Sequence, residues 1–215
     1  MIFGNRANHT TSMKTKGKRT TTIRAREDRK GFYGALKRNL KLSDAKAAAG
    51  LLQNNTSVAI YTGTTCLIFA REIPPDLSLI VVTGSLPVAV EIGRKPRIKT
   101  ILIGGDYNAP NFTTYGLMAV KQVESFNLDV LFMSVDGLSA DNGCTIDQYF
   151  EADINETLIR NAKKVVVMVD HSKIGVVKFI KIADLADIDV IITDDKIPET
   201  EKEKLQHLNA EMVVV

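Results

Sequence analysis

A short apolar run rich in Val, Ile and Leu recurs along this chain, and most of these runs end in small polar residues. Unbroken β-branched runs are typical of strands that are buried on both faces, as in parallel sheets. Alternation of strand, loop and helix favours an α/β fold with a mainly parallel sheet flanked by helices on both faces. The predicted strands are 57–61, 79–83, 100–103, 129–135, 164–169, 189–193 and 211–215.

Segments with helical character fill most of the intervals between these strands. Alanines within 31–53 favour a helix that ends before Asn54. The stretch 107–114 and the stretch through 143–145 are polar and lack helical periodicity, so we expect them to be loops. The other predicted helices are 65–72, 86–94, 116–126, 151–162 and 198–208.

Length and composition are typical of one globular domain. A chain of 215 residues can bury one sizeable α/β core, and 45% apolar with 25% charged residues is ordinary globular composition. No apolar run approaches ~20 residues, the length that a membrane span needs. The N-terminus also lacks the apolar core of a signal peptide, so we expect a cytoplasmic protein.

The charges are distributed unevenly along the chain. Residues 1–50 contain 13 Lys/Arg and 3 Asp/Glu, a net charge of +10, whereas residues 51–215 carry a net charge of −7. Residues 1–30 lack an apolar pattern, so we expect a flexible basic arm there and a folded domain over 31–215. A solvated tail is a simpler interpretation of the arm than specific DNA recognition, because no recognition-helix pattern accompanies the charges. Any DNA binding by the arm is expected to be weak, nonspecific and limited to low salt.

Neither the cysteines nor the histidines have the spacing of a metal site. Cys66 and Cys144 lie in loop-like contexts without a CxxC pair, so we assign no disulfide and no zinc site. His9, His171 and His207 are isolated, and we assign no metal to them. Cys66 closely follows a glycine loop, where a helix N-terminus could activate its thiol; an inert packed thiol is the alternative.

The stretch Thr62-Gly63-Thr64-Thr65 joins the predicted strand 57–61 to the following helix. Gly63 lets the backbone approach a ligand closely, and Thr64 or Thr65 can cap the helix and donate a hydroxyl. The first N–H groups of a helix have no partner within it and attract anions. This stretch alone fits a phosphate cradle and an ordinary capped turn equally well.

Small polar residues follow four other predicted strands in the same way. Carboxyl ends of parallel strands meet at one edge of a sheet, so five such loops favour a site for a phosphorylated, hydroxyl-rich molecule. Lys173 would supply charge for the phosphate, and Asp136 would accept hydrogen bonds from sugar hydroxyls. For any single loop, turn chemistry is the better explanation, and only the five loops together favour a site. The four loops contain Thr83-Gly84-Ser85, Gly104-Gly105, Asp136-Gly137 and Ser172-Lys173.

Six motifs, taken together in their order and spacing, resemble the C-terminal effector-sensing domain of DeoR-type bacterial transcriptional regulators over about residues 28–215. They are Tyr61-Thr62-Gly63-Thr64-Thr65, Val82-Thr83-Gly84-Ser85-Leu86, Ile103-Gly104-Gly105, Val135-Asp136-Gly137-Leu138, Gly143-Cys144-Thr145 and Asp170-His171-Ser172-Lys173. The resemblance implies a fold similar to ribose-5-phosphate isomerase and the CoA transferases, with a phosphosugar bound at the strand ends. It further implies a homo-oligomer in which the ligand modulates DNA binding by an N-terminal winged helix-turn-helix.

The same resemblance assigns candidate binding residues. The phosphate-contacting positions are Thr62, Gly63, Thr64, Thr65 and Lys173. The sugar-facing positions are Thr83, Gly84, Ser85, Gly104, Gly105, Asp136, Gly137 and Glu151. We assign no catalytic residue, no metal and no cofactor.

Three features depart from the family pattern. The family usually has Asp where Tyr61 stands and Asn where Gly84 stands, so a carboxylate and an amide are replaced. A winged helix-turn-helix needs roughly 60 residues with three patterned helices, and residues 1–30 offer none. We therefore expect no sequence-selective operator binding by this chain, and DNA contact only through a separate helix-turn-helix or weakly through the arm.

Two other functions compete with the sensor. A phosphosugar isomerase would need a positioned base, for which Asp136 and Glu151 are the candidates, but the second acid beside Asp136 is replaced by Ser139 or Ala140. An oligomerisation module without a ligand is the third hypothesis, and Tyr61 with Gly84 is its main support. The resemblance favours a non-enzymatic sensor that does not bind membranes.

Overall fold

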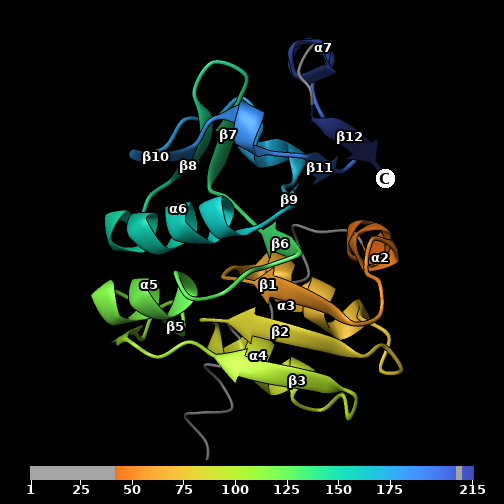
Figure 1. Cartoon of the computed structure of the whole chain (residues 1–215). Helices are drawn as coiled ribbons and strands as arrows, with labels where there is room; N and C mark the ends of the chain where they lie inside the picture. Colours follow the sequence, from red (N-terminus) through yellow and green to blue (C-terminus); the bar gives the residue numbers. More distant parts are fainter. Residues whose placement is uncertain (1–41, 207–209) are drawn as a thin grey trace, which may run out of the picture. The chain divides into compact units, whose positions relative to one another are not determined.

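Seven strands form one sheet in which neighbouring strands run parallel. The computed structural model describes residues 42–206 and 210–215, so the predicted arm over 1–30, His9 and His207 lie outside the described residues. The strand order is β12-β11-β9-β6-β1-β2-β3 (Figure 1). These strands are β1 (Thr56–Ile60), β2 (Leu79–Thr83), β3 (Ile98–Leu102), β6 (Val130–Met133), β9 (Val165–Met168), β11 (Val190–Thr193) and β12 (Glu211–Val214).

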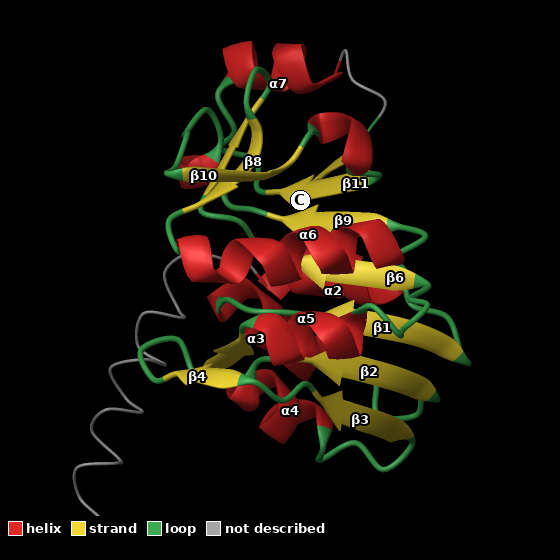
Figure 2. Ribbon diagram, turned by 60° about the vertical axis from the view of Figure 1, so that its left-hand side comes forward, coloured by secondary structure: helices red, strands yellow, loops and turns green. Residues whose placement is uncertain are grey.

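Helices cover both faces of this sheet, which confirms the predicted fold class. One layer contains α2 (Leu42–Gly50), α3 (Thr64–Glu72) and α4 (Leu86–Ile92), and the other contains α5 (Leu117–Val123) and α6 (Ala152–Asn161) (Figure 2). The remaining helical elements are α7 (Glu199–Gln206) and the 3-10 segments η1 (Tyr149–Glu151), η2 (His171–Lys173) and η3 (Leu185–Asp187). Within the described ranges, no helix has the length and apolar character needed to cross a bilayer.

The order in which the chain adds strands across the sheet reverses between β1 and β6, although the two strands are parallel. From β1 the chain proceeds through β2 to β3 on one side, and then returns to β6, β9, β11 and β12 on the other. Right-handed crossovers put the helices of these two halves on opposite faces of the sheet. The loops that leave β1 and β6 therefore diverge, and in open parallel sheets the carboxyl ends at such a reversal are where ligands usually bind.

The apolar runs form strands because both of their faces are covered. Every residue of β9 and β11 is buried, as expected for strands with helices on both sides. At the centre of the sheet, Phe132 of β6 packs on Phe69 of α3 with ring centroids 4.4 Å apart. This contact fixes α3 against the sheet and thereby positions the loop that joins β1 to α3.

Two stretches that the sequence predicted to be loops contain paired strands: the prediction is wrong for 143–145 and for both ends of 107–114, whereas 109–112 is a turn as expected. The stretch 107–114 contributes to an antiparallel hairpin, and 143–145 lies in a strand of a three-stranded antiparallel sheet of order β10-β8-β7. These short strands lack strong local patterns because their pairing partners stabilise them. They are β4 (Asp106–Asn108), β5 (Thr113–Tyr115), β7 (Gly137–Ser139), β8 (Gly143–Ile146) and β10 (Ile180–Ala183).

One carboxylate joins the amino ends of three parallel strands. Asp129, just before β6, accepts hydrogen bonds from the backbone N–H and the hydroxyl of Ser57, both at 2.8 Å, and pairs with Lys163 at 2.8 Å. The bond from Lys163 and those from Ser57 lower the pKa of Asp129 from its ordinary 3.8 to about 2. The charged carboxylate therefore favours the folded state at neutral pH.

We expect Asp129→Asn to reduce the loss of stability in acid. A depressed pKa contributes stability that is present above the unfolded value of 3.8 and is lost as the pH falls toward about 2. The asparagine variant should be less stable than the wild type at pH 7, and the difference should narrow between pH 4 and 2. Urea unfolding at several pH values measures this; a difference that stays constant with pH would contradict the assignment.

Candidate functional site

The five predicted polar loops lie at one edge of the sheet. They follow β1, β2, β3, β6 and β9, which are mutually parallel, so all five leave the sheet at its carboxyl edge. The loops after β1 and β6 flank the reversal of strand order. This edge is therefore the candidate ligand site.

The loop after β1 leaves the N-terminus of α3 open. Gly63 precedes the helix with φ at 113°, a conformation that favours glycine, and a Cβ there would lie 3.4 Å from the Cβ of Ser134. Thr62 and Thr64 are partly exposed, Thr65 is buried, and no side chain caps α3. The first backbone N–H groups of α3 are thus available to an anion.

Lys173 projects from η2 toward the end of β6. Asp170 accepts a hydrogen bond from the backbone N–H of Ser172 and fixes the turn that carries Lys173. The Lys173 ammonium donates to the carbonyl of Val135 at 2.7 Å and lies 3.8 Å from the Asp136 carboxylate. Its charge also lowers the pKa of Cys66 in the first turn of α3, against the larger raising effect of burial. The ammonium therefore lies at the carboxyl end of β6, the parallel neighbour of the strand β1 that precedes α3.

Two carboxyl groups accompany this cation. Asp136 is partly exposed and accepts a hydrogen bond from the backbone N–H of Asp147 at 3.1 Å. Glu151 is 4% exposed and accepts from the hydroxyl of Thr113 at 2.9 Å. Burial raises the pKa of Glu151, hydrogen bonds from the hairpin lower it, and the charge of Asp136 raises it further. Besides Lys173, the candidate site thus contains one partly exposed carboxyl group and one buried carboxyl group.

The loop after β2 is covered by the β4–β5 hairpin. Thr83 is fully buried, and its hydroxyl accepts from the backbone N–H of Ser85 at 3.0 Å. Ser85 is 4% exposed, and the carbonyl of Gly84 accepts from the backbone N–H of Thr114 at 2.8 Å. The structure therefore places these three predicted sugar-facing positions beneath the hairpin.

The other predicted glycines occupy different positions along the edge. Gly104 and Gly105 are exposed, and the backbone of Gly104 exchanges two hydrogen bonds of 3.1 Å with the side chain of Gln122. Gly137 is buried: a Cβ there would lie 2.5 Å from the carbonyl oxygen of Val176. Close packing at this position thus requires a glycine.

Tyr61, Thr113 and Ser134 are absent from the predicted set but lie next to Gly84, Glu151 and Gly63 of that set, respectively. The Tyr61 hydroxyl donates to the carbonyl of Thr114 at 3.0 Å, and burial, followed by the charge of Glu151, raises the pKa of the phenol. Thr113 was missed because its hairpin was taken for a loop. β-branched and aromatic residues on both sides of Pro110 were the available signal.

His171 is hydrogen-bonded to a carboxylate at the same edge. Its Nδ1 lies 2.8 Å from the carboxylate of Asp194, which also accepts from the backbone N–H groups of His171 and Lys196. Burial raises the pKa of Asp194, but these hydrogen bonds outweigh burial and hold it below its ordinary value. Across residues 42–206 and 210–215, no group of three or more His, Cys, Asp or Glu is placed to hold a metal ion.

Both cysteines lie in regular structure, so their predicted loop placement is wrong. Cys66 lies in α3, Cys144 lies in β8, and both are fully buried. Burial raises the pKa of each thiol to about 12, so the inert alternative for Cys66 holds. We expect neither thiol to react with Ellman's reagent in the native protein and both to react in denaturant; rapid native reaction of Cys66 would contradict this.

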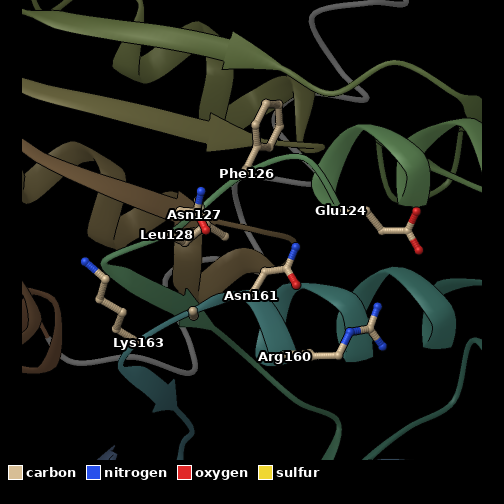
Figure 3. A pocket seen from close by; sticks show the side chains of 8 residues that line it. Glu124, Phe126, Asn127, Leu128, Arg160, Asn161 and Lys163 are labelled. Carbon is tan, nitrogen blue, oxygen red and sulfur yellow. The ribbon is translucent and has the colours of Figure 1, made fainter.

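A separate pocket opens at the opposite edge of the sheet. It has a volume of about 260 Å³ and lies between the carboxyl ends of α5 and α6 (Figure 3). It is lined by Glu124, Phe126, Asn127, Leu128, Arg160, Asn161, Ala162 and Lys163. The segments that line it precede β6 and β9, so none of the predicted binding residues contributes to it.

Comparison with solved structures finds partial matches at low sequence identity. The β subunit of eIF2B from Chaetomium thermophilum matches 70% of this chain and 47% of its own, at 10% identity and a TM-score of 0.50. Ribose 5-phosphate isomerase A from Methanocaldococcus jannaschii matches 62% of this chain and 52% of its own, at 18% identity and a TM-score of 0.44. At such identities the likeness concerns the fold alone.

Comparison with curated proteins and family models identifies the family. HTH-type transcriptional regulator GolR from Listeria innocua is 31% identical over 186 residues, which span 86% of this chain and 73% of GolR. HTH-type transcriptional regulator GlpR from Haloferax volcanii is 30% identical over 173 residues, 80% of this chain and 68% of GlpR. The model for the DeoR C-terminal sensor domain matches residues 37–195. The chain therefore belongs to the DeoR C-terminal sensor domain family.

Proposed function

We propose that residues 31–215 bind a phosphorylated sugar at the carboxyl edge and that the bound sugar alters the action of the regulator on DNA. Family membership supports a regulatory sensor. The observation that carries the ligand class is that the Lys173 ammonium, at the carboxyl end of β6, and the uncapped N-terminus of α3, after the neighbouring strand β1, lie at the same edge of the sheet. A cation and a helix N-terminus together favour an anion with several acceptor oxygens, as phosphate has.

The two ends of the ligand would meet different groups. The phosphate would accept hydrogen bonds from Lys173, from the hydroxyls of Thr62, Thr64 and Thr65, and from backbone N–H groups beyond Gly63. Asp136 lies 3.8 Å from Lys173 and would accept from the nearest sugar hydroxyl. Glu151, whose carboxyl group accepts a hydrogen bond from the Thr113 hydroxyl, would be a second, buried acceptor for a sugar hydroxyl.

A sensor explains the acidic groups better than an isomerase does. The GolR and GlpR relatives are named as transcriptional regulators. Glu151 is buried and engaged by Thr113, so it is fixed as an acceptor rather than free to exchange protons with a substrate. We propose that the protein binds its ligand without turnover and works as a homo-oligomer.

Paired ligands test the proposal. Calorimetric titration of the protein with glycerol 3-phosphate, erythrose 4-phosphate and glucose 6-phosphate should detect binding of at least one of them. The corresponding unphosphorylated compounds should not bind, because the phosphate supplies the main contacts. Equal binding of phosphorylated and unphosphorylated partners would overturn the phosphate site, and conversion of a ligand to its isomer would favour the enzyme.

A further inference from the structure

One aromatic side chain fills the carboxyl edge between β1 and β2. Tyr61 is 1% exposed although it follows β1 at the edge where the ligand is proposed to bind. Its ring lies against Gly84, where a Cβ would stand 2.8 Å from the Cε2 atom of Tyr61. Cβ atoms are not found that close to a ring carbon in proteins, so any side chain at position 84 would overlap the Tyr61 ring.

The β4–β5 hairpin is fastened over this ring. The Tyr61 hydroxyl donates to the carbonyl of Thr114 at 3.0 Å. The hydroxyl of Thr114 donates to the carbonyl of Ile103 at 2.7 Å, and its backbone N–H donates to the carbonyl of Gly84 at 2.8 Å. These three hydrogen bonds engage six polar groups of the hairpin and of the ends of β1, β2 and β3 with each other, so the six groups are not directed to a ligand.

The accessible polar groups lie on the other side of β1. Thr62 and Thr64 are partly exposed, and the side chains of Lys173 and Asp136 are 29% and 43% exposed. The hydroxyl-bearing residues after β2 are buried, with Thr83 at 0% and Ser85 at 4%. A ligand at this edge therefore meets its polar partners near β1, β6 and β9, where the strand order reverses.

We propose, resting on the function proposed above, that Tyr61 and Gly84 form a coupled specificity pair that selects short phosphorylated polyols or sugars over hexose phosphates. The cation and the hydroxyl acceptor are only 3.8 Å apart, so a phosphate and a hydroxyl on nearby carbons satisfy both. A longer chain that continued along the edge would run into the space that the Tyr61 ring fills. The ring thus limits the ligand without being its hydrogen-bonding partner.

Thermal unfolding of single and double variants tests the coupling. Gly84→Ala should lower the melting temperature by about 4 °C or more, since the new Cβ must displace the ring. In a Tyr61→Leu background the same substitution should cost less, because the closest contact, the ring carbon, is gone and only the two Thr114 oxygens at 3.1 Å remain. Equal costs in the two backgrounds would overturn the coupling.

Calorimetric titration with ligands of two lengths tests the specificity. The wild type should bind glycerol 3-phosphate or erythrose 4-phosphate at least about tenfold more tightly than glucose 6-phosphate or fructose 6-phosphate. Tyr61→Leu should reduce that ratio to below about threefold, whereas Tyr61→Phe should preserve it because the ring remains. Tyr107→Leu, an exposed hairpin tyrosine, is the matched control and should also preserve it.

Gly84→Ala keeps the test decisive if Tyr61→Leu does not fold, because it displaces the same ring and should also narrow the ratio. Equal affinity of the wild type for short and long phosphates would overturn the specificity while leaving the phosphate site in place. Absence of binding by every phosphorylated ligand, inorganic phosphate included, would overturn the proposed function and the specificity together. The unfolding measurements would then still decide whether the two residues are coupled.

Discussion

Lys173→Met should weaken the binding of a phosphorylated sugar at least about tenfold, because one charge-assisted hydrogen bond to phosphate contributes about 1.5–3 kcal/mol. Methionine keeps an unbranched side chain of similar length and removes only the ammonium. The loss should be confined to phosphorylated ligands, since the charge acts on the phosphate. Calorimetric titration of the wild type and the variant with the same ligand measures the change.

A neighbouring lysine provides the matched control for this change. Lys178 pairs with Asp147 at 3.0 Å and lies just before β10 rather than at the end of β6. Lys178→Met should leave the affinity for the phosphorylated ligand within about twofold of the wild type, because exposed ion pairs contribute little. If the two variants lost affinity equally, net charge rather than the position of Lys173 would be responsible.

Gly143→Ala should lower the free energy of unfolding by about 3 kcal/mol or more, since a strained backbone and an overpacked contact each cost about 1–3 kcal/mol. Gly143 starts β8 with φ at 70°, a conformation that L side chains rarely adopt. A Cβ at this position would also run into the carbonyl oxygen of Ala183 in β10. Urea unfolding followed by circular dichroism measures the loss.

Gly50→Ala is the matched control for the glycine substitution. Gly50 ends α2, and a Cβ there would meet no atom within 4 Å. Alanine favours helix over glycine, so this variant should be as stable as the wild type or slightly more stable. Similar losses at the two glycines would mean that the close contact with Ala183 is not what makes Gly143 necessary.

The parallel sheet could be predicted from the sequence because its strands carry their own signal. Runs such as Leu79–Thr83 and Val165–Met168 are unbroken apolar segments, and the observed β2 and β9 fall within the predicted ranges. The three-residue strands β4, β5 and β7 carry no comparable signal. They exist because of pairing across the hairpins, which local composition does not encode.

The positions of the candidate site likewise divide into those that the sequence indicates and those that only the structure reveals. The sequence could place Gly63 and Lys173 at this edge of the sheet, because each of them follows a recognisable apolar strand. The burial of Thr83 and Ser85 could not be read, because it depends on a hairpin whose strands were missed. Tyr61 could be recognised as unusual, but its fit against Gly84 requires the distance between two adjacent strands.

Because the strand order reverses between β1 and β6, the proposed binding site is complete only when several strands have assembled. The strands that meet there are far apart in the chain: Ser57 and Asp129, which are hydrogen-bonded at their amino ends, are separated by 72 positions. Lys173 arrives from a third strand, 38 positions beyond its partner Val135. A nascent or clipped chain that ends before η2 therefore lacks the ammonium that Lys173 places at the carboxyl end of β6. Occupancy by an effector would consequently report that β1, β6 and β9 have assembled, and the effector would stabilise the folded domain by an amount that grows with the logarithm of its concentration.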